Sequence, residues 1–286
     1  NSITNIENFM TSSAVYADLS YNKIGEFLDL PPFIVNLNLS HNCIQKVKAI
    51  NSVNIKTIDF SNNLIESIPY INCSEMIFPF NPISSLDSIS RKITFLDISK
   101  SGIVEIPSNI FLIPILNTIL APFNKIESIP DGITSSVVRK LDLSFNPIQK
   151  FAQLPKNIEH LALNCCELNE FPSSLSEYQE LIEISFAGNK IQSVDEAAIP
   201  KQIQSLNLAN NHITDFSVSK KIFRDLKFID LSFNSIKNLR NLLFEIRLPT
   251  LFFLDLSFNP IEQSSFKNNG LKPFSLIPKL RRLILN

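Results

Sequence analysis

Tryptophan is absent from this sequence, glycine and cysteine are scarce, and there is no long apolar run. The five glycines, at positions 25, 102, 132, 188 and 270, cannot supply the glycine-rich loop that cradles a phosphate. No apolar run approaches the roughly 18 residues of a membrane helix, because even the stretch from Phe111 to Phe123 is broken by Pro114 and Pro122. We therefore expect neither a phosphate-binding loop nor a membrane span in this segment.

An excess of either charge is also missing. Lys and Arg number 26, Asp and Glu number 27, and the net charge is −1. A nucleic-acid partner selects for a strongly basic surface. We expect no nucleic acid among the partners.

The four cysteines are Cys43, Cys73, Cys165 and Cys166. They show neither the paired spacing that closes the ends of secreted repeat proteins nor a zinc-binding pattern. Unpaired cysteines are typical of a reducing compartment. The sequence therefore favours a cytoplasmic or otherwise intracellular location and no bound metal.

One phrase recurs along the whole chain, in the order apolar, x, x, apolar, x, apolar, x, x, Asn, x, apolar. Two of the clearest copies run from Leu226 to Ile236 and from Leu251 to Ile261. The third apolar residue of each copy marks the register at Leu19, Leu39, Phe60, Phe78, Ile98, Ala121, Leu143, Leu163, Phe186, Leu208, Leu231, Leu256 and Leu285. Even spacing of this kind indicates a stack of identical structural units.

The phrase resembles the leucine-rich-repeat superfamily over essentially the whole chain. Several copies continue with a second phrase, as in Ile65 to Pro69, that is similar to the short-repeat class of intracellular and bacterial members. The resemblance implies an α/β solenoid: a leucine-rich-repeat horseshoe with a concave parallel β-sheet and mostly extended or 3-10 convex segments. We interpret residues 1–286 as a single domain of about 12 complete repeats, with partial repeats at both ends.

The asparagine of the phrase has a physical role inside such a stack. Its amide both donates and accepts hydrogen bonds, so it can satisfy backbone groups where each strand ends in a turn. Ser101 and Cys166 take its place in two repeats. The expected structural ladder is Asn22, Asn42, Asn63, Asn81, Asn124, Asn146, Asn189, Asn211, Asn234 and Asn259.

The two ends and the longest repeats suggest further features. Residues 1–6 read as the second half of a repeat and residues 280–286 as the first part of another. Solenoids normally carry polar caps, so we expect a piece of a longer protein, such as a multidomain signalling protein of a protist. Helical turns are expected near Val218–Asp225 and Phe244–Pro249, and a surface loop at Gln263–Pro278.

The residue between the second and third apolar positions of each phrase should line the concave face, because side chains alternate along a strand. Six of these residues are aspartates and form a broken acidic stripe. The stripe is interpreted either as a dock for a basic segment or as the commonest wording of the motif, Leu-Asp-Leu-Ser. A cation between Asp230 and Asp255, on consecutive strands, is a third and weaker interpretation.

Aromatic residues gather on the last two complete repeats, beside two arginines. Exposed aromatic residues with Arg are typical anchors of protein interfaces. Packing of the rings on one another is the alternative. The candidate protein-binding residues are Phe228, Phe252, Phe253, Phe233, Phe258, Asp230, Asp255, Arg281 and Arg282. A second aromatic stripe, expected to pack along one rim, precedes the ladder at Tyr21, Phe80, Phe123, Phe145, Phe233 and Phe258.

Catalytic constellations are not found in the sequence. His41, His160 and His212 lie in separate repeats, and carboxylates on an open sheet lack the burial that makes a general acid. We therefore expect no catalytic residue and no cofactor in this segment. The function predicted is a protein-interaction module, a scaffold or targeting arm that binds a protein on its concave face. Two alternatives stay open: the regulatory region of a larger signalling enzyme (a metal-dependent protein phosphatase, adenylate cyclase, kinase or GTPase) and a receptor ectodomain.

Overall fold

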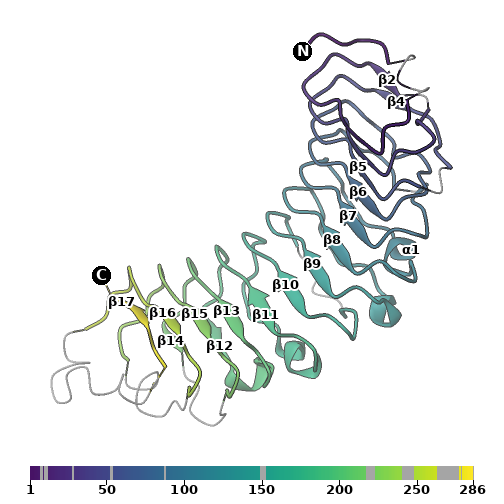
Figure 1. Cartoon of the computed structure of the whole chain (residues 1–286). Helices are drawn as coiled ribbons and strands as arrows, with labels where there is room; N and C mark the ends of the chain where they lie inside the picture. Colours follow the sequence, from purple (N-terminus) through teal and green to yellow (C-terminus); the bar gives the residue numbers. More distant parts are fainter. Residues whose placement is uncertain are drawn as a thin grey trace. The chain divides into compact units, whose positions relative to one another are not determined.

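A computed structural model describes residues 1–6, 9, 12–27, 29–51, 54–86, 88–148, 153–216, 223–239, 248–262, 277 and 279–285 (Figure 1). The chain forms two compact units. The first unit comprises Asn1–Asn146 with Ala152–Pro155, and the second comprises Pro147–Phe151 with Lys156–Asn286. The interpretation of residues 1–286 as one domain stays a prediction.

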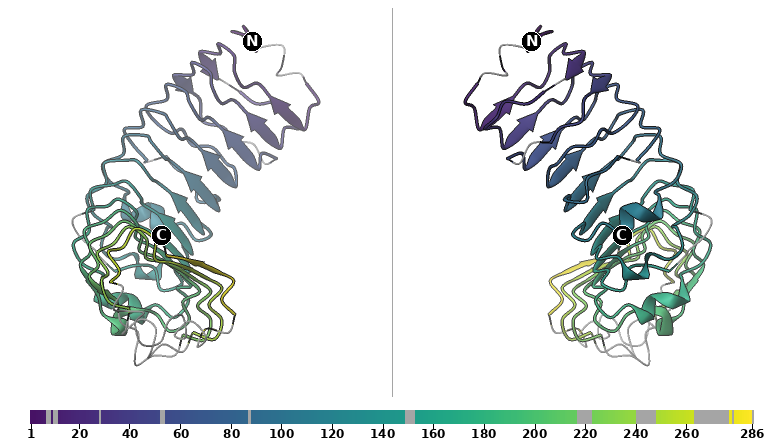
Figure 2. Two further views of the ribbon diagram at one scale, coloured as in Figure 1. Left: turned by 90° about the vertical axis from the view of Figure 1, so that its left-hand side faces the viewer. Right: turned by 90° about the vertical axis from the view of Figure 1, so that its right-hand side faces the viewer.

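Each repeat of the first unit contributes one three-residue strand to a parallel sheet. The strands lie side by side in chain order, so each coil stacks on the one before it (Figure 2). They are β1 (Tyr16–Asp18), β3 (Asn36–Asn38), β5 (Thr57–Asp59), β6 (Glu75–Ile77), β7 (Phe95–Asp97), β8 (Thr118–Leu120) and β9 (Lys140–Asp142).

The second unit repeats this arrangement. Its parallel strands again follow chain order, and their register pairs equivalent residues of successive repeats, such as Ile229 with Leu254. They are β10 (His160–Ala162), β11 (Glu183–Ser185), β13 (Ser205–Asn207), β15 (Phe228–Asp230), β16 (Phe253–Asp255) and β17 (Arg282–Ile284).

The other side of the coils is built from extended chain and short turns. Two-residue strands pair there in parallel, β2 (Glu26–Phe27) with β4 (Lys46–Val47) and β12 (Ser193–Val194) with β14 (Asp215–Phe216). Short helices complete this side: the one-turn α1 (Ser108–Phe111) and the 3-10 helices η2 (Ile133–Ser135), η3 (Ser173–Glu177) and η4 (Glu196–Ala198). Repeats this short leave no chain for full helices, and the fold class expected from the sequence is confirmed as a solenoid with little helix.

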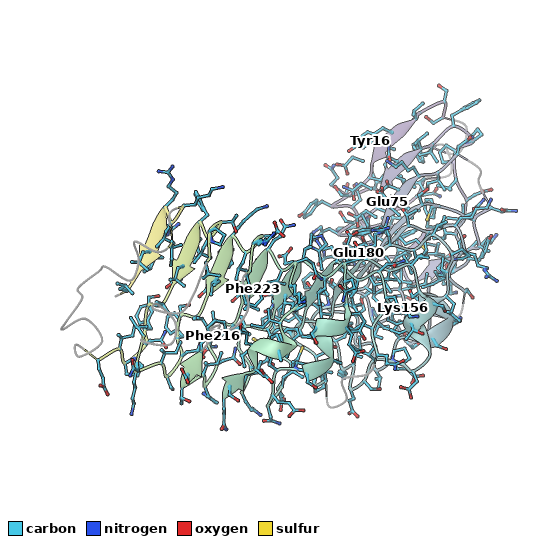
Figure 3. The ribbon with its side chains drawn as sticks, turned by 90° about the horizontal axis from the view of Figure 1, so that it is seen from below. Tyr16, Glu75, Lys156, Glu180, Phe216 and Phe223 are labelled. Atoms are coloured by element: carbon cyan, nitrogen blue, oxygen red, sulfur yellow. The ribbon has the colours of Figure 1, made fainter. Side chains whose placement is uncertain are left out.

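The core lies inside the coils of each unit. The central residue of nearly every sheet strand is buried, as at Leu37 and Ile58. Phe60 and Phe78 meet inside the first unit with ring centroids 5.1 Å apart. Phe216 and Phe223, labelled in Figure 3, are buried within the second unit. A single coil cannot bury such side chains alone, which is why stacking stabilises the fold.

The sheet strands begin one residue earlier than the apolar-x-apolar segment suggests. All strands from β3 to β16 in the sheet have a buried central residue and outward residues at their first and third positions, as in Phe228–Asp230, whereas the central residues of β1 and β17 are only partly buried. The outward surface therefore has two rows, which we call the sheet face. The expected helical turns near Val218–Asp225 and Phe244–Pro249 and the expected loop at Gln263–Pro278 lie largely outside the described residues.

Candidate interaction surface

The asparagine ladder runs through both units beside the sheet. At Asn146, Oδ1 accepts the backbone N–H of Ile126, and Nδ2 donates to the carbonyl oxygens of Ala121 and Leu143, each at 2.9 Å. Asn234 repeats the pattern in the second unit with Ile213, Leu208 and Leu231. One side chain thus joins the turn of its own repeat to the turn of the repeat before it.

The two substituted positions of the ladder are supported by their neighbours. Oδ1 of Asn124 accepts the backbone N–H groups of both Ser101 and Ile103, each at 3.0 Å. Asn189 does the same for Cys166 and Leu168. In both cases, the ladder asparagine of the next repeat accepts a hydrogen bond from the backbone N–H of the substituted residue, Ser101 or Cys166.

The acidic stripe has a structural explanation in the backbone turn after each strand. The third strand residue is Asp or Asn in eight repeats, and its Oδ1 accepts the backbone N–H two residues later at 2.8–3.1 Å. The pairs are Asp18–Ser20, Asn38–Ser40, Asp59–Ser61, Asp97–Ser99, Asp142–Ser144, Asn207–Ala209, Asp230–Ser232 and Asp255–Ser257.

Two repeats show why this residue is chosen. Ile77 and Leu120 replace the polar residue where Pro79 and Pro122 stand two positions later. Proline has no N–H, so an acceptor there would have nothing to accept. Asn38 and Asn207 make the same bond as the aspartates, so the turn requires an oxygen acceptor and not a charge. The stripe by itself is therefore weak support for a basic ligand.

Five of the candidate residues of the second unit lie on β15, β16 and β17, and the others lie beside these strands. The rings of Phe228 and Phe253 stack with centroids 4.5 Å apart and planes 7° apart. The guanidinium of Arg282 lies 5.4 Å from the centroid of Phe253. Phe252, just before β16, is 55% exposed, and Arg281, just before β17, is also exposed. Asp230 and Asp255 are register partners on the same face.

Phe233 and Phe258 belong to a rim formed by the residue before each ladder position. Their rings stack at 4.1 Å and are 52% and 60% exposed. All rim residues have left-handed backbone, with φ of 51–58°, or 70° at Gly188. The rim is Tyr21, His41, Asn62, Phe80, Lys100, Phe123 and Phe145 in the first unit and Cys165, Gly188, Asn210, Phe233 and Phe258 in the second.

The aromatic rim residues are held in a backbone conformation that suits glycine or asparagine better. Left-handed backbone costs an ordinary L-residue about 1–2 kcal/mol. Stacking compensates for part of this cost, as in Phe123 on Phe145 at 4.0 Å and Tyr21 on His41 at 4.1 Å. The packing role expected for the stripe is thus present as ring pairs that leave each ring partly exposed.

Sequence reasoning missed a second apolar surface, in the first unit. Ile77 and Leu120 lie half-buried on the sheet face on either side of β7, which carries Phe95. Phe80 and Phe123 lie on the rim of the same repeats as Ile77 and Leu120. The available signal was the pair of prolines two residues after an apolar strand residue.

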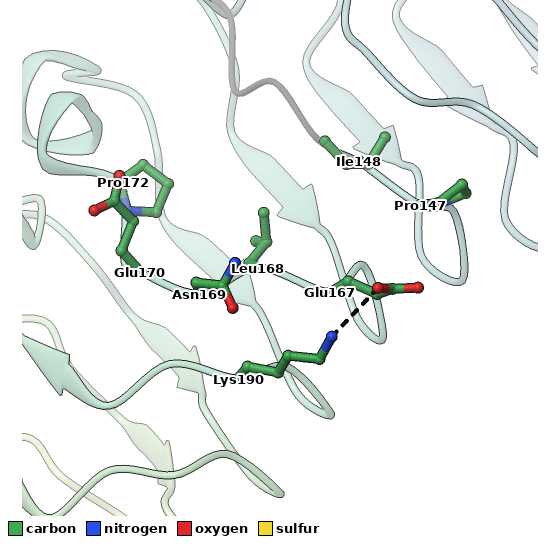
Figure 4. A pocket seen from close by; sticks show the side chains of 8 residues that line it. All are labelled: Pro147, Ile148, Glu167, Leu168, Asn169, Glu170, Pro172 and Lys190. Carbon is green, nitrogen blue, oxygen red and sulfur yellow. Dashed lines mark hydrogen bonds and ion pairs between the residues drawn. The ribbon is translucent and has the colours of Figure 1, made fainter.

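Each unit also has a surface hollow beside a substituted ladder position. The hollow of the second unit, about 620 Å³, is lined by Ile148 and Leu168 and crossed by the ion pair of Glu167 and Lys190 at 3.3 Å (Figure 4). Glu167 has a left-handed φ of 61° there, and Gly102 has one of 75° at the corresponding hollow of the first unit. The altered turn next to Cys166 or Ser101 accompanies both hollows.

Groups suited to chemistry are few among the described residues. No three His, Cys, Asp or Glu side chains in that part of the chain come together in a way that would hold a metal ion. Burial raises the pKa of the Cys73 thiol to about 12, which disfavours its thiolate. His160 is occupied by Glu183 at 2.8 Å. In the same described residues, no helix is both long and apolar enough to cross a bilayer.

Comparison with known proteins finds relatives of partial similarity. No family model matches the chain. Receptor like protein 23 of Arabidopsis thaliana is 33% identical over 96 residues, which is 30% of this chain and 10% of that protein. Transforming growth factor beta activator LRRC33 of Danio rerio is 25% identical over 264 residues, 88% of this chain and 35% of that protein. The chain thus spans only part of either relative.

Among solved structures, YopM from Yersinia enterocolitica superposes with a TM-score of 0.69 at 23% identity, covering 95% of this chain and 55% of that one. This likeness concerns the fold alone. The relatives give no support to the expected intracellular location, since a receptor-like protein is among them. The recurrent phrase, the one parallel strand per repeat and the likeness in fold to YopM together show that the chain has the leucine-rich-repeat fold.

Proposed function

We propose that the chain is a recognition module that binds a protein partner on the sheet face of its second unit. The binding residues are Phe228, Phe252 and Phe253 with Arg281 and Arg282, flanked by the rim pair of Phe233 and Phe258. One observation carries the proposal: large aromatic side chains, two of them stacked in register, lie on a mostly polar sheet face, and the guanidinium of Arg282 lies over the ring of Phe253.

The energetics of this surface favour binding over simple packing. Phe252 is 55% exposed, and the stacked pairs leave Phe233 and Phe258 more than half exposed. Burying apolar area stabilises a complex by about 25 cal/mol per Å², and exposed apolar patches usually mark interaction sites. The stacked rings are already ordered, so their side chains lose little conformational entropy when a partner binds.

The two aspartates act in this proposal mainly as supports. Oδ1 of Asp230 accepts from the backbone N–H of Ser232 at 2.9 Å, and Asp255 does the same with Ser257 at 2.8 Å. Each bond fixes the turn that leads to a rim phenylalanine. We expect these residues to position the aromatic surface, and the segment as a whole to act by binding.

The test is designed on the repeat that carries β13, because it has the same frame with small polar residues. Phe228→Ser copies Ser205, Phe233→Asn copies Asn210, and Phe252 is the position for a photo-crosslinking residue that captures and identifies the partner. The affinity of the purified partner is then measured for wild type and for the Phe228→Ser/Phe253→Ser/Phe233→Asn variant. We expect at least a tenfold loss, about 1.4 kcal/mol.

The matched control is Tyr16→Asn, which removes an exposed aromatic residue from the sheet face of the first unit and copies Asn36. It should leave the affinity unchanged. Equal affinity of the triple variant and wild type, with both folded, would rule out this surface as the site.

A receptor ectodomain is a second candidate function, favoured by the likeness to receptor like protein 23. Such a domain would use the same surface to bind its ligand outside the cell. Capture of the crosslinked partner from a secreted fraction, and not from cytosol, distinguishes this candidate from an intracellular scaffold.

A further inference from the structure

The first unit carries an apolar surface of its own, which we call the β6–β8 patch. It consists of Ile77, Phe95 and Leu120 on the sheet face with Phe80 and Phe123 on the rim. Ile77 and Leu120 each pair in register with Asp97 of the intervening strand. Adjacent strands lie about 4.8 Å apart, so a carboxylate stands between two apolar side chains about 9.6 Å apart.

The rim beside this patch forms a rigid wall. Nζ of Lys100 lies between two rings, 4.7 Å from the centroid of Phe80 and 4.6 Å from that of Phe123. Phe123 in turn stacks on Phe145 at 4.0 Å. Phe80 and Phe123 are nevertheless 48% and 45% exposed. The wall is therefore ordered in advance and keeps apolar area available.

The charge around the patch has one dominant sign. The outward residues of β1, β3, β5, β6, β7 and β8, all of them described, include four carboxylates and no Lys, Arg or His. The carboxylates are Asp18, Asp59, Glu75 and Asp97. On β9, the next strand, Asp142 pairs in register with Leu120, and the one cation, Lys140, pairs with Thr118. Lys56 lies at the edge, 3.8 Å from Glu75, and Lys100 is held by the rim rings. The complementary partner surface is basic.

The carboxylate of Asp97 is only partly used by the fold. Its Oδ1 accepts from both the backbone N–H and the hydroxyl of Ser99, and the residue is partly exposed. A carboxylate has two oxygens and about four acceptor positions. Asp97 therefore keeps acceptor capacity toward the solvent at the centre of the β6–β8 patch.

We propose that the β6–β8 patch docks an extended, basic segment of a partner protein in which a lysine or arginine is flanked by two apolar residues. The apolar side chains contact Ile77 and Leu120, and the cation lies over Asp97. In a polyproline II segment, residues three apart point to the same side and are separated by about 9.3 Å. This spacing matches the distance of about 9.6 Å between Ile77 and Leu120, which lie two strands apart.

This proposal is independent of the function proposed for the second unit, because it concerns other strands and another kind of partner. The test uses methyl NMR on the whole chain with two synthetic probes, Ac-Ser-Leu-Arg-Pro-Leu-Ser-NH2 and the same peptide with Glu in place of Arg. Ile77 and Leu120 are direct reporters, since most other Ile and Leu side chains are buried in the core. We expect saturable shifts of their methyl signals with the Arg peptide only.

Two variants separate charge from packing. Asp97→Asn keeps the bond to Ser99, as Asn38 keeps its bond to Ser40. It should weaken the binding of the Arg peptide about threefold and reduce its salt dependence. Asp230→Asn is the matched control in the second unit and should change nothing. The Ile77→Asn/Leu120→Asn variant, altered only on the sheet face, should lose saturable binding.

Several outcomes would overturn the proposal. Equal binding of the Arg and Glu peptides would show that charge does not select the ligand. If Asp97→Asn bound the Arg peptide as tightly as the wild type does, the arginine would not lie over Asp97. Shifts confined to other residues, or no shift of Ile77 and Leu120 at millimolar peptide, would mean that the patch does not dock this class of segment.

Discussion

The two units share an interior and differ in what they present on the sheet face. Both stack one short parallel strand per repeat on a ladder of asparagines. In the first unit, the outward residues from β1 to β8 are polar or acidic around the β6–β8 patch. In the second, β15 to β17 present Phe228, Phe253 and Arg282. A common frame thus carries two surfaces of different chemistry.

The comparison shows which positions are free to vary. The third strand residue is usually tied to the backbone: in eight strands it is Asp or Asn and accepts the N–H two residues later, and it is apolar before Pro79 and Pro122. Ala162, Ser185 and Ile284 are the exceptions. The first strand residue has no such duty, and it ranges from Glu75 to Phe95 to Lys140. We infer that the first strand residue and the rim are free to encode recognition. The third residue can do so where a proline releases it from the turn, as at Ile77 and Leu120, or where its carboxylate keeps acceptor positions, as at Asp97.

The strongest test of the shared frame is removal of one ladder amide in each unit. Asn146→Ala and Asn234→Ala each remove the amide that binds a backbone N–H and backbone carbonyl groups, which are then left without this hydrogen-bond partner. An unsatisfied buried polar group costs about 1–3 kcal/mol. We expect each variant to lose about 2–3 kcal/mol in urea-induced unfolding, with faster amide exchange in the adjoining turns.

Asn169→Ala, on an exposed residue outside the ladder, is the control and should change stability by less than about 0.5 kcal/mol. If the loss of unfolding free energy in one unit were less than half of that in the other, the two units would not share one frame. That outcome would mean that the asparagine ladder is a stabilising frame in one unit and a minor feature in the other.

The turn after each strand gives the next largest effect. Asp59→Ala and Asp255→Ala remove the acceptor for Ser61 and Ser257, and each should cost about 1 kcal/mol in thermal unfolding. Asp59→Asn and Asp255→Asn should cost almost nothing, because the amide oxygen replaces the carboxylate. If Asn proves as costly as Ala, the charge itself stabilises the turn and the acidic stripe regains its significance.

Much of the frame could be predicted from sequence because it repeats. The spacing of the apolar positions gives the strands, and the asparagine gives the ladder, since both are enforced by burial in every coil. The same repetition misleads at Asp59 or Asp255, where a charge seems to form a functional stripe. Only the bond to the N–H two residues later shows that an oxygen acceptor is what the position requires.

The surfaces were harder to predict, since they depend on contacts across repeats. The cluster of Phe228 and Phe253 was visible because it is dense in the sequence. Ile77 and Leu120 belong to separate repeats with β7 between them, and they resemble ordinary core residues in a chain that is 44% hydrophobic. The left-handed rim was invisible too, because nothing in the sequence Ser-Phe-Asn signals a positive φ at Phe145.

Substitutions at the rim should change the stability of the two units by different but smaller amounts. Phe258→Asn should change stability by no more than about 0.5 kcal/mol, because the relief of left-handed strain, about 1–2 kcal/mol, offsets one lost ring stack of about 0.5–1.5 kcal/mol. Phe123→Asn loses both Phe145 and Lys100 as neighbours and should be destabilised more. Asn62 and Asn210 already occupy this position. Equal effects on thermal unfolding would show that the Lys100 contact contributes nothing.

The smallest effect concerns the first carboxylate of the frame. Hydrogen bonds from the Ser20 side chain and then from its backbone N–H hold the pKa of Asp18 below its ordinary value. A lowered pKa in the folded state means that this contribution is complete above the unfolded pKa, about 3.9, and is lost as pH falls through the folded pKa.

An NMR titration of the Asp18 carboxyl should therefore give a midpoint below about 3.9 in the folded protein. Ser20→Ala should raise this midpoint while leaving the backbone bond at 2.9 Å in place. A midpoint at the ordinary value in the wild type would mean that the Ser20 hydroxyl does not reach the carboxylate in solution. The turn would then rest on the backbone bond alone, as it does in the repeat with Asn207 and Ala209.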